Sequence, residues 1–276
     1  MVTAEIILPS VALQPFVHHY WILKTADVSM SNIILPDGTL HWMFHRKKTF
    51  DVDSISQEGV KASATGLYDK AIRISSTEDV ELITVFFQPY AAGAIMGMPC
   101  KTLSFDNIDF DSLEMMDFKE LKRHVLDADT TEECIDMIED FILKRLIKTQ
   151  GTPYLQQLQR VFDLMKVKAD VHIDELASVA CLSERQFRRV FMDNVGMSPK
   201  LIQRIMRFRR ATNQLIRSVP KNLDNVLYLN GYTDHSHFNH EFHDIVGISP
   251  TEYIASLDKV RKRGVMPVYR SYHAQK

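Results

Sequence analysis

Residues 231–250 read GYTDHSHFNHEFHDIVGISP. A second stretch, ACLSERQFRRVFMDNVGMSP at residues 180–199, repeats its two phenylalanines and its Gly-x-Ser-Pro ending 51 positions earlier. An internal repeat of this kind indicates two copies of one structural unit. Each copy predicts a helix, a tight turn and a second helix, which is the layout of DNA readers whose second helix lies in the major groove.

The second helix of the first copy is expected to turn a basic face to solvent. Phe187, Val190 and Phe191 follow the period of a helix and would hold it on its own core. The opposite side carries side chains that can read base edges or clamp phosphates: Arg185, Gln186, Arg188 and Arg189. Ser183, the expected N-cap, is a candidate phosphate contact.

The corresponding helix of the second copy has little fixed charge on its reading face. Opposite Phe238 and Phe242 stand side chains that can form hydrogen bonds with bases: His235, Ser236, Asn239 and His240. Thr233, just ahead of this helix, is a candidate phosphate contact.

A long helix over residues 200–217 is predicted between the copies. At 1.5 Å per residue it would span about 30 Å and hold the two reading helices roughly one DNA turn apart. It contains five arginines, of which Arg207 and Arg210 are candidates for phosphate or structural contacts. A solvated charged face is the alternative interpretation of this run.

Residues 155–257 resemble the DNA-binding module of the AraC/XylS family of bacterial transcription regulators. The resemblance rests on residues 231–242 and on the Gly-Ile-Ser-Pro ending at 247–250. It implies seven helices in two helix-turn-helix units, binding to double-stranded DNA and, in activators, contact with RNA polymerase. The positions that depart from the family pattern are Cys181 in the first turn, Leu227 and His240. These departures imply that the second unit binds DNA more weakly than the first.

The two halves of the chain carry opposite net charge. Residues 1–150 contain 14 Lys and Arg against 23 Asp and Glu, and residues 151–276 contain 19 against 12, which gives net charges of −9 and +7. The basic half is the part expected to meet a polyanion. We therefore predict a sensor or dimerisation domain at 1–150, a DNA-binding domain at 151–260 and a basic tail at 261–276.

The sequence pattern of the first half predicts mostly strands, followed by helices. Expected strands, bounded by turn signals, lie at residues 20–23, 32–35, 40–45 and 81–88. From about Phe118 the pattern is helical, with Thr130 or Thr131 as an N-cap. The apolar stripe from Ile135 to Leu146 is expected to pack on the β domain, with a second subunit as the alternative.

This order predicts an α+β protein with a mostly β N-terminal domain, trailing helices and an all-α C-terminal domain, and the resemblance described next implies that the β domain is a cupin-like β-barrel. The first half also resembles, more weakly, the variable β-barrel sensor domains that precede the module in many relatives. The shared landmarks are Tyr20-Trp21, Pro36-Asp37-Gly38 and Phe87-Gln88-Pro89.

A small-molecule effector is a predicted partner of the first half, because β-barrels tend to bind ligands in their mouths. The candidate pocket residues are Trp21, His41 and Trp42. The alternative is that both tryptophans are core residues. In a strand, His41 and His45 lie about 13 Å apart, too far for one metal ion without further ligands. We expect neither a metal nor a cofactor.

Other classes of protein fit the sequence less well. No stretch approaches the roughly 18 apolar residues of a membrane span, and the N-terminus lacks a signal pattern, so we expect a cytoplasmic protein without a membrane partner. Three scattered cysteines do not suit a disulfide framework. An enzyme delivered to DNA would need either an activated cysteine or a metal triad, and Cys100 lacks neighbours that could activate it. An N-terminal domain that only forms a homodimer remains an alternative to a sensor.

Overall fold

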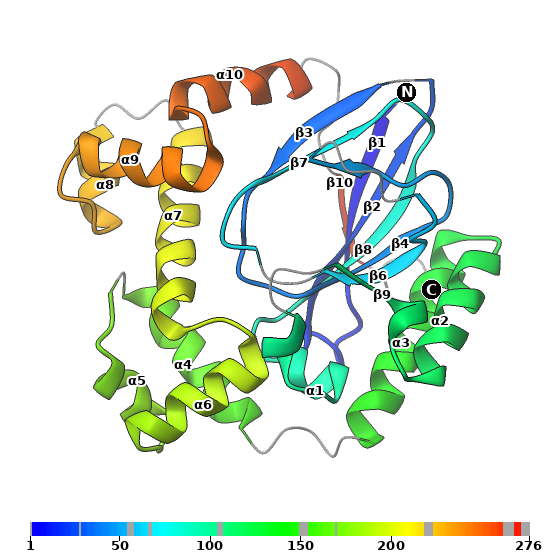
Figure 1. The fold of residues 1–276 in the computed structure, drawn as a ribbon, viewed down its shortest axis with the longest axis horizontal. Helices are drawn as coiled ribbons and strands as arrows, with labels where there is room; N and C mark the ends of the chain where they lie inside the picture. The colour runs from blue at the N-terminus through cyan, green and yellow to red at the C-terminus, as the bar shows by residue number, and fades with distance from the viewer. Residues whose placement is uncertain are drawn as a thin grey trace.

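The chain folds into β-sheets with flanking helices on one side and a group of helices on the other (Figure 1). The residues that the computed structural model describes are 2–27, 29–53, 58–65, 68–103, 107–148, 154–168, 170–217, 223–261 and 268–271. The expected boundary between residues 150 and 151 lies outside this described part, as does most of the expected tail.

The described strands form two sheets. The larger has the order β10-β1-β2-β8-β4-β6-β9 and the smaller has the order β3-β7-β5. The four expected strands correspond to β2, β3, β4 and β8. The strand bounds are β1 Val2–Leu8, β2 Val17–Thr25, β3 Met30–Ile34, β4 His41–His45, β5 Asp51–Val52, β6 Ala62–Thr65, β7 Ile72–Ser76, β8 Glu81–Phe87, β9 Asn107–Asp109 and β10 Val268–Ser271.

The α+β class is confirmed, but the strands of the described part do not close into the expected barrel. The larger sheet ends at β10 and β9, and the smaller ends at β3 and β5. Leu23 and Leu82 of the larger sheet share a buried cluster with Ile74 of the smaller one. Side chains between two sheets therefore fill the interior. The edge strands β5 and β9 are only two and three residues long, too short for the continuous pairing that a barrel needs.

Helices cover the other face of the larger sheet. The N-cap prediction is confirmed, because Thr130 Oγ1 accepts the N–H of Glu133, whose carboxylate accepts the N–H of Thr130. Ile135, Ile138 and Ile142 are buried in the main core, so the predicted stripe packs on the β domain. These helices are α1 Ala92–Met96, α2 Met116–Asp127 and α3 Thr131–Lys148, with 3-10 turns η1 Cys100–Leu103 and η2 Phe110–Ser112.

Seven further helices follow in the described part, as the resemblance implied. Figure 1 shows α7 joining the α4–α6 group at one end to the α8–α10 group at the other. Among the described helices, none combines the length and the hydropathy that a membrane span requires. The bounds are α4 Leu155–Val167, α5 Ile173–Val179, α6 Glu184–Val195, α7 Pro199–Arg217, α8 Leu223–Leu229, α9 His235–Val246 and α10 Pro250–Arg261.

The two groups of helices have different cores. The α4–α6 group belongs to one apolar cluster with the N-terminal half, in which the rings of Tyr90 and Phe162 lie 5.9 Å apart. The α8–α10 group has its own cluster around Phe238 and Phe242, and Leu35 of the N-terminal half inserts into it. Both groups are thus packed against the β domain.

Candidate DNA interface

The two units have the same tight turn. In each, a residue with positive φ donates its N–H to the carbonyl three residues earlier, and the next residue donates to the carbonyl five residues earlier. The positive-φ residue is Cys181 in the first unit (φ 55°) and Gly231 in the second (φ 79°). Cys181 therefore occupies a left-handed position, where glycine is favoured.

The first reading helix, α6, is held from inside and exposed outside. Ser183 Oγ accepts the N–H of Gln186, and Gly196 ends the helix at φ 86°. Phe187 and Phe191 are fully buried, and Phe191 stacks on Phe162 of α4. The helix is thus fixed to its own core, as its sequence predicted.

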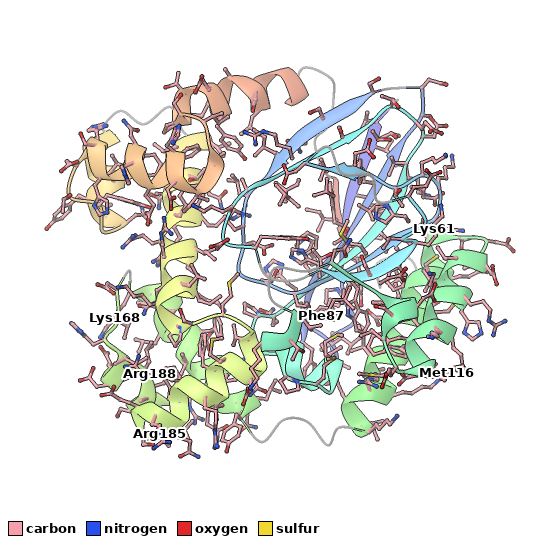
Figure 2. All side chains as sticks on the ribbon, viewed as in Figure 1. Lys61, Phe87, Met116, Lys168, Arg185 and Arg188 are labelled. Atoms are coloured by element: carbon pink, nitrogen blue, oxygen red, sulfur yellow. The ribbon has the colours of Figure 1, made fainter. Side chains whose placement is uncertain are left out.

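The predicted reading residues of α6 lie on the opposite side. Arg185, Arg188 and Arg189 are exposed and Gln186 is half-buried. Figure 2 shows Arg185 and Arg188 at the edge of the molecule, away from the sheets. Arg188 forms an ion pair with Glu184 at 3.1 Å, with both side chains about half exposed. Such surface pairs contribute little free energy, so the guanidinium is available to another anion.

The second reading helix, α9, repeats this arrangement. Asp234 caps it by accepting the N–H of His237 at 2.8 Å, and Gly247 ends it at φ 78°. Phe238 and Phe242 are buried beside Tyr232 and Tyr253. Exposed polar residues lie on the other side: His235, Ser236, Asn239 and His240. Thr233, ahead of the helix, is also exposed and contacts Asp234 and His237 through its hydroxyl.

Arg207 and Arg210 of α7 are engaged inside the protein. Arg207 Nη2 lies 2.8 Å from Glu241 Oε1, and its guanidinium lies over the Tyr232 ring at 5.1 Å. Arg210 Nη1 donates to the Lys166 carbonyl at 3.0 Å. Of the two roles considered for these arginines, the observed contacts are structural.

Glu241 is a buried charged residue that the sequence did not single out and that fixes the second reading helix. It is buried on the inner face of α9 and accepts hydrogen bonds from Arg204, Arg207 and the Tyr232 hydroxyl. Burial would raise the pKa of Glu241, but the hydrogen bonds from Tyr232 and Arg204 and the charge of Arg207 hold it below its ordinary value. The available signal was the repeat, because the equivalent position in α6 is the buried Val190.

The three candidate effector residues do not share one face. Trp42 is fully buried towards the helices, where its ring contacts Phe87 and Phe118. His41 precedes it in β4 and therefore points to the opposite face. There it contacts Asp37 at 3.0 Å. Trp21 is half-buried at the cluster between the sheets.

Two buried hydroxyls lie on the face that Trp21 and His41 share. Thr84 pairs with Trp21 and Thr65 pairs with His41 in register, and paired residues point to the same side of a sheet. Both Oγ1 atoms are buried without a hydrogen-bond partner. Buried polar atoms normally have one, so this face has unsatisfied hydrogen-bonding capacity. No group of three or more metal-ligating side chains occurs in the described ranges.

Two family models match the chain. One, described as a helix-turn-helix domain, matches residues 176–256, and the other, a domain of unknown function (DUF6597), matches residues 5–109. Among curated proteins, the probable transcriptional regulator LumQ of Photobacterium leiognathi is 28% identical over 139 residues, covering 49% of this chain and 55% of that protein. An uncharacterised HTH-type transcriptional regulator of Haemophilus influenzae is 29% identical over 140 residues, covering 49% and 46%. The chain thus spans about half the length of these relatives.

Solved structures of similar arrangement include ToxT from Vibrio cholerae, with a TM-score of 0.45, 12% identity and coverage of 86% of this chain and 97% of that one. An AraC-type regulator from Chromobacterium violaceum has a TM-score of 0.33 and 24% identity, covering 37% and 91%. The helix-turn-helix model spans both tight turns and both reading helices that the repeat predicted, so residues 176–256 form a helix-turn-helix domain of the kind that the resemblance to the AraC/XylS family implied.

Proposed function

We propose that this protein is a sequence-specific transcription regulator that binds double-stranded DNA with both helix-turn-helix units. The observation that carries the proposal is the pair of capped helices α6 and α9, each with buried phenylalanines and exposed polar residues, joined by one continuous helix. That helix, α7, has 19 residues and a length of about 28 Å, which suits readers in successive major grooves about 34 Å apart.

The basic helix α6 supplies most base contacts in the proposed complex. Arg185, Arg188 and Arg189 can fork to guanine edges, and Gln186 can pair with adenine. From α9, the base-reading residues are His235, Ser236, Asn239 and His240. Phosphate contacts fall to Ser183 and Thr233 at the helix N-termini. We assign Arg207 and Arg210 to structural roles, because a carboxylate and a carbonyl already hold them.

The N-terminal domain modulates DNA binding in this proposal, either by binding a small effector or by forming a homodimer. The unpartnered hydroxyls of Thr65 and Thr84 beside Trp21 and His41 support the effector, since a polar ligand there would satisfy them. RNA polymerase is a partner if the protein is an activator. The protein would work in the cytoplasm, where bacterial DNA lies.

We propose no catalytic role. An enzyme fused to a DNA reader would need a thiolate nucleophile, and Cys100 is the cysteine considered for it. Burial and the charge of Asp193 raise the pKa of Cys100 to about 12, so the thiol stays protonated at neutral pH.

Selection of bound sequences from random duplex DNA tests the proposal. We expect two separated half-motifs, one for each reading helix. A single half-motif would remove α9 from base reading, and failure to enrich any sequence would refute the proposed function.

Arginine variants test the assignment of α6. Arg188→Ala and Arg189→Ala should each cost about 1–3 kcal/mol of specific binding and relax sequence preference at the contacted base pair. Lys144→Ala on α3, 76% exposed, is the control for loss of one positive charge. Unaltered sequence preference in the Arg188/Arg189 double variant would exclude both residues from the reading face.

A further inference from the structure

The N-terminal half holds the two reading helices at equivalent positions. Asp193 of α6 and Asp244 of α9 are the same residue of the repeat, 51 positions apart. Asp193 forms an ion pair with Lys101 at 2.8 Å, and Asp244 forms one with Lys70 at 2.5 Å. Both lysines come from the N-terminal half, one from η1 and the other from the segment before β7.

Backbone contacts occur beside both ion pairs. Gly93 of α1 packs so closely on α6 that a Cβ there would lie 3.0 Å from the Cα of Asn194. At the equivalent position of α9, Ile245, the carbonyl accepts the N–H of Ala71 at 2.7 Å. Lys70 Nζ also donates to the Asp244 carbonyl at 2.7 Å, which places a positive charge at the negative end of the helix dipole.

A third contact lies on the helix between the readers. Gly38, in the Pro36-Asp37-Gly38 turn, has φ +73°, and a Cβ there would lie 3.0 Å from Ile202 Cδ1 of α7. This turn was a landmark of the sequence, and its place in the fold is the contact with α7. The N-terminal half therefore touches each reader and the helix that joins them.

These contacts leave the reading faces uncovered. Arg185 lies eight residues before Asp193, so it is about 12 Å away along the helix axis. Ser236 stands in the same relation to Asp244. Arg185 and Ser236 are both exposed in the docked arrangement. The N-terminal half thus contacts the C-terminal ends of α6 and α9, and the reading residues one turn earlier, Arg189 and His240, stay exposed.

We propose that the N-terminal domain fixes the relative orientation of the two reading helices, α6 and α9, through the ion pairs Lys101–Asp193 and Lys70–Asp244. The proposal rests on the function proposed above. Two reading helices that are already held in the orientation that DNA requires lose less conformational entropy on binding. Once one helix has bound its half-motif, the other meets its own half-motif at a higher effective concentration. Lys70 and Lys101 are positioning residues for DNA binding, and they contact no DNA themselves.

The dependence of DNA affinity on the spacing between the two half-motifs distinguishes a role in positioning the reading helices from a role in the stability of the protein. Full-length protein is titrated with duplexes that carry both selected half-motifs at the selected spacing, the same duplexes with one to three base pairs inserted, and a duplex with the α6 half-motif alone. Lys70→Gln with Lys101→Gln should weaken binding to the two-motif duplex about fivefold. It should flatten the dependence on spacing and change binding to the single half-motif by less than about twofold.

Three further variants complete the test. Lys144→Gln removes the same charge from an exposed site on α3 and should leave the spacing dependence intact. Lys101→Asp should flatten the dependence of affinity on half-motif spacing. Adding Asp193→Lys to this variant should restore that dependence, because the ion pair re-forms with reversed charges. Lys70 and Lys101 are 51% and 53% exposed, so the substitutions are compatible with the fold, and thermal unfolding of each variant checks this.

The outcomes distinguish this inference from the proposed function. Suppose that the wild-type protein selects two half-motifs and that the lysine variants keep the wild-type affinity and spacing dependence. The positioning role of Lys70 and Lys101 is then refuted, and the proposed function stands. Tighter binding by the lysine variants would also overturn it, because the contacts would then restrain the readers. If the wild-type protein selects no sequence, the proposed function itself fails.

Discussion

Replacing Glu241 by Gln should loosen the second reading helix while leaving the first in place. The Glu241 carboxylate accepts bonds from Arg204 Nε at 2.9 Å and from Arg207 Nη2 at 2.8 Å, as well as from the Tyr232 hydroxyl. Gln keeps the shape and loses the charge. A charge-assisted hydrogen bond contributes about 1 kcal/mol more than a neutral one, so two of them give a loss of about 2 kcal/mol.

This loss is smaller than the roughly 3–5 kcal/mol for breaking a fully buried ion pair. The reason is solvent, because the side chains of Arg204 and Arg207 are 33% and 21% exposed, whereas that of Glu241 is 7% exposed. The remaining charge on the arginines is therefore partly hydrated in the variant.

Amide hydrogen exchange of α9 measures this change directly. A loss of about 2 kcal/mol should speed exchange of the protected α9 amides about 30-fold at neutral pH. Glu184→Gln on α6 is the matched control, because its partner Arg188 is exposed and the pair contributes little. Both tryptophans lie in the N-terminal half, so their fluorescence would not report on α9.

The sign of the pH dependence provides a second check. Glu241 has a folded-state pKa below its usual 4.5, so its stabilising contribution is complete above about pH 4.5 and is lost as the pH falls towards the folded-state value. The difference between wild type and Glu241→Gln should shrink in that window. Unaltered exchange of α9 in the variant, or a difference that does not change with pH, would refute the reasoning.

Three other changes test local features. Cys181→Gly should raise the free energy of unfolding by about 0.5–1 kcal/mol, since φ 55° strains a residue with a Cβ, and a lower Tm would contradict this. Ser183→Ala removes the cap on the N–H of Gln186 and should cost about 1 kcal/mol, seen as faster exchange at the start of α6; unaltered exchange there would mean that the cap contributes nothing. Burial and the charges of His18 and His41 lower the pKa of His19 from 6.5 to about 4. The unfolded chain then binds more protons between those values, so stability falls as the pH drops through them. His19→Gln should flatten this part of the Tm curve, and an unaltered slope would assign it to other groups.

The alternation of side chains along a strand explains why the three candidate effector residues do not line one site. His41 and Trp42 are neighbours in β4, and side chains alternate between the faces of a strand. The sequence therefore already contained the reason why one faces the helices and the other faces the space near Trp21. Which face meets the helices depended on where α2 and α3 pack.

The two reading helices could be located from sequence because each of their features depends on residues about one turn away. A cap at Ser183, a left-handed glycine at 196 and two phenylalanines four positions apart are local signals, and the repeat shows them twice. The acidic and basic halves were equally visible in composition.

The partners of Glu241, the docking of both readers and the open edges of the sheets depended on the packing of whole elements. Glu241 meets Arg207 across 34 positions, and Lys70 meets Asp244 across 174. No periodicity or turn signal connects residues so far apart, because their contact depends on the combined geometry of every element between them. Local hydrogen bonding and amphipathicity thus specified the readers, and long-range packing specified how they are held.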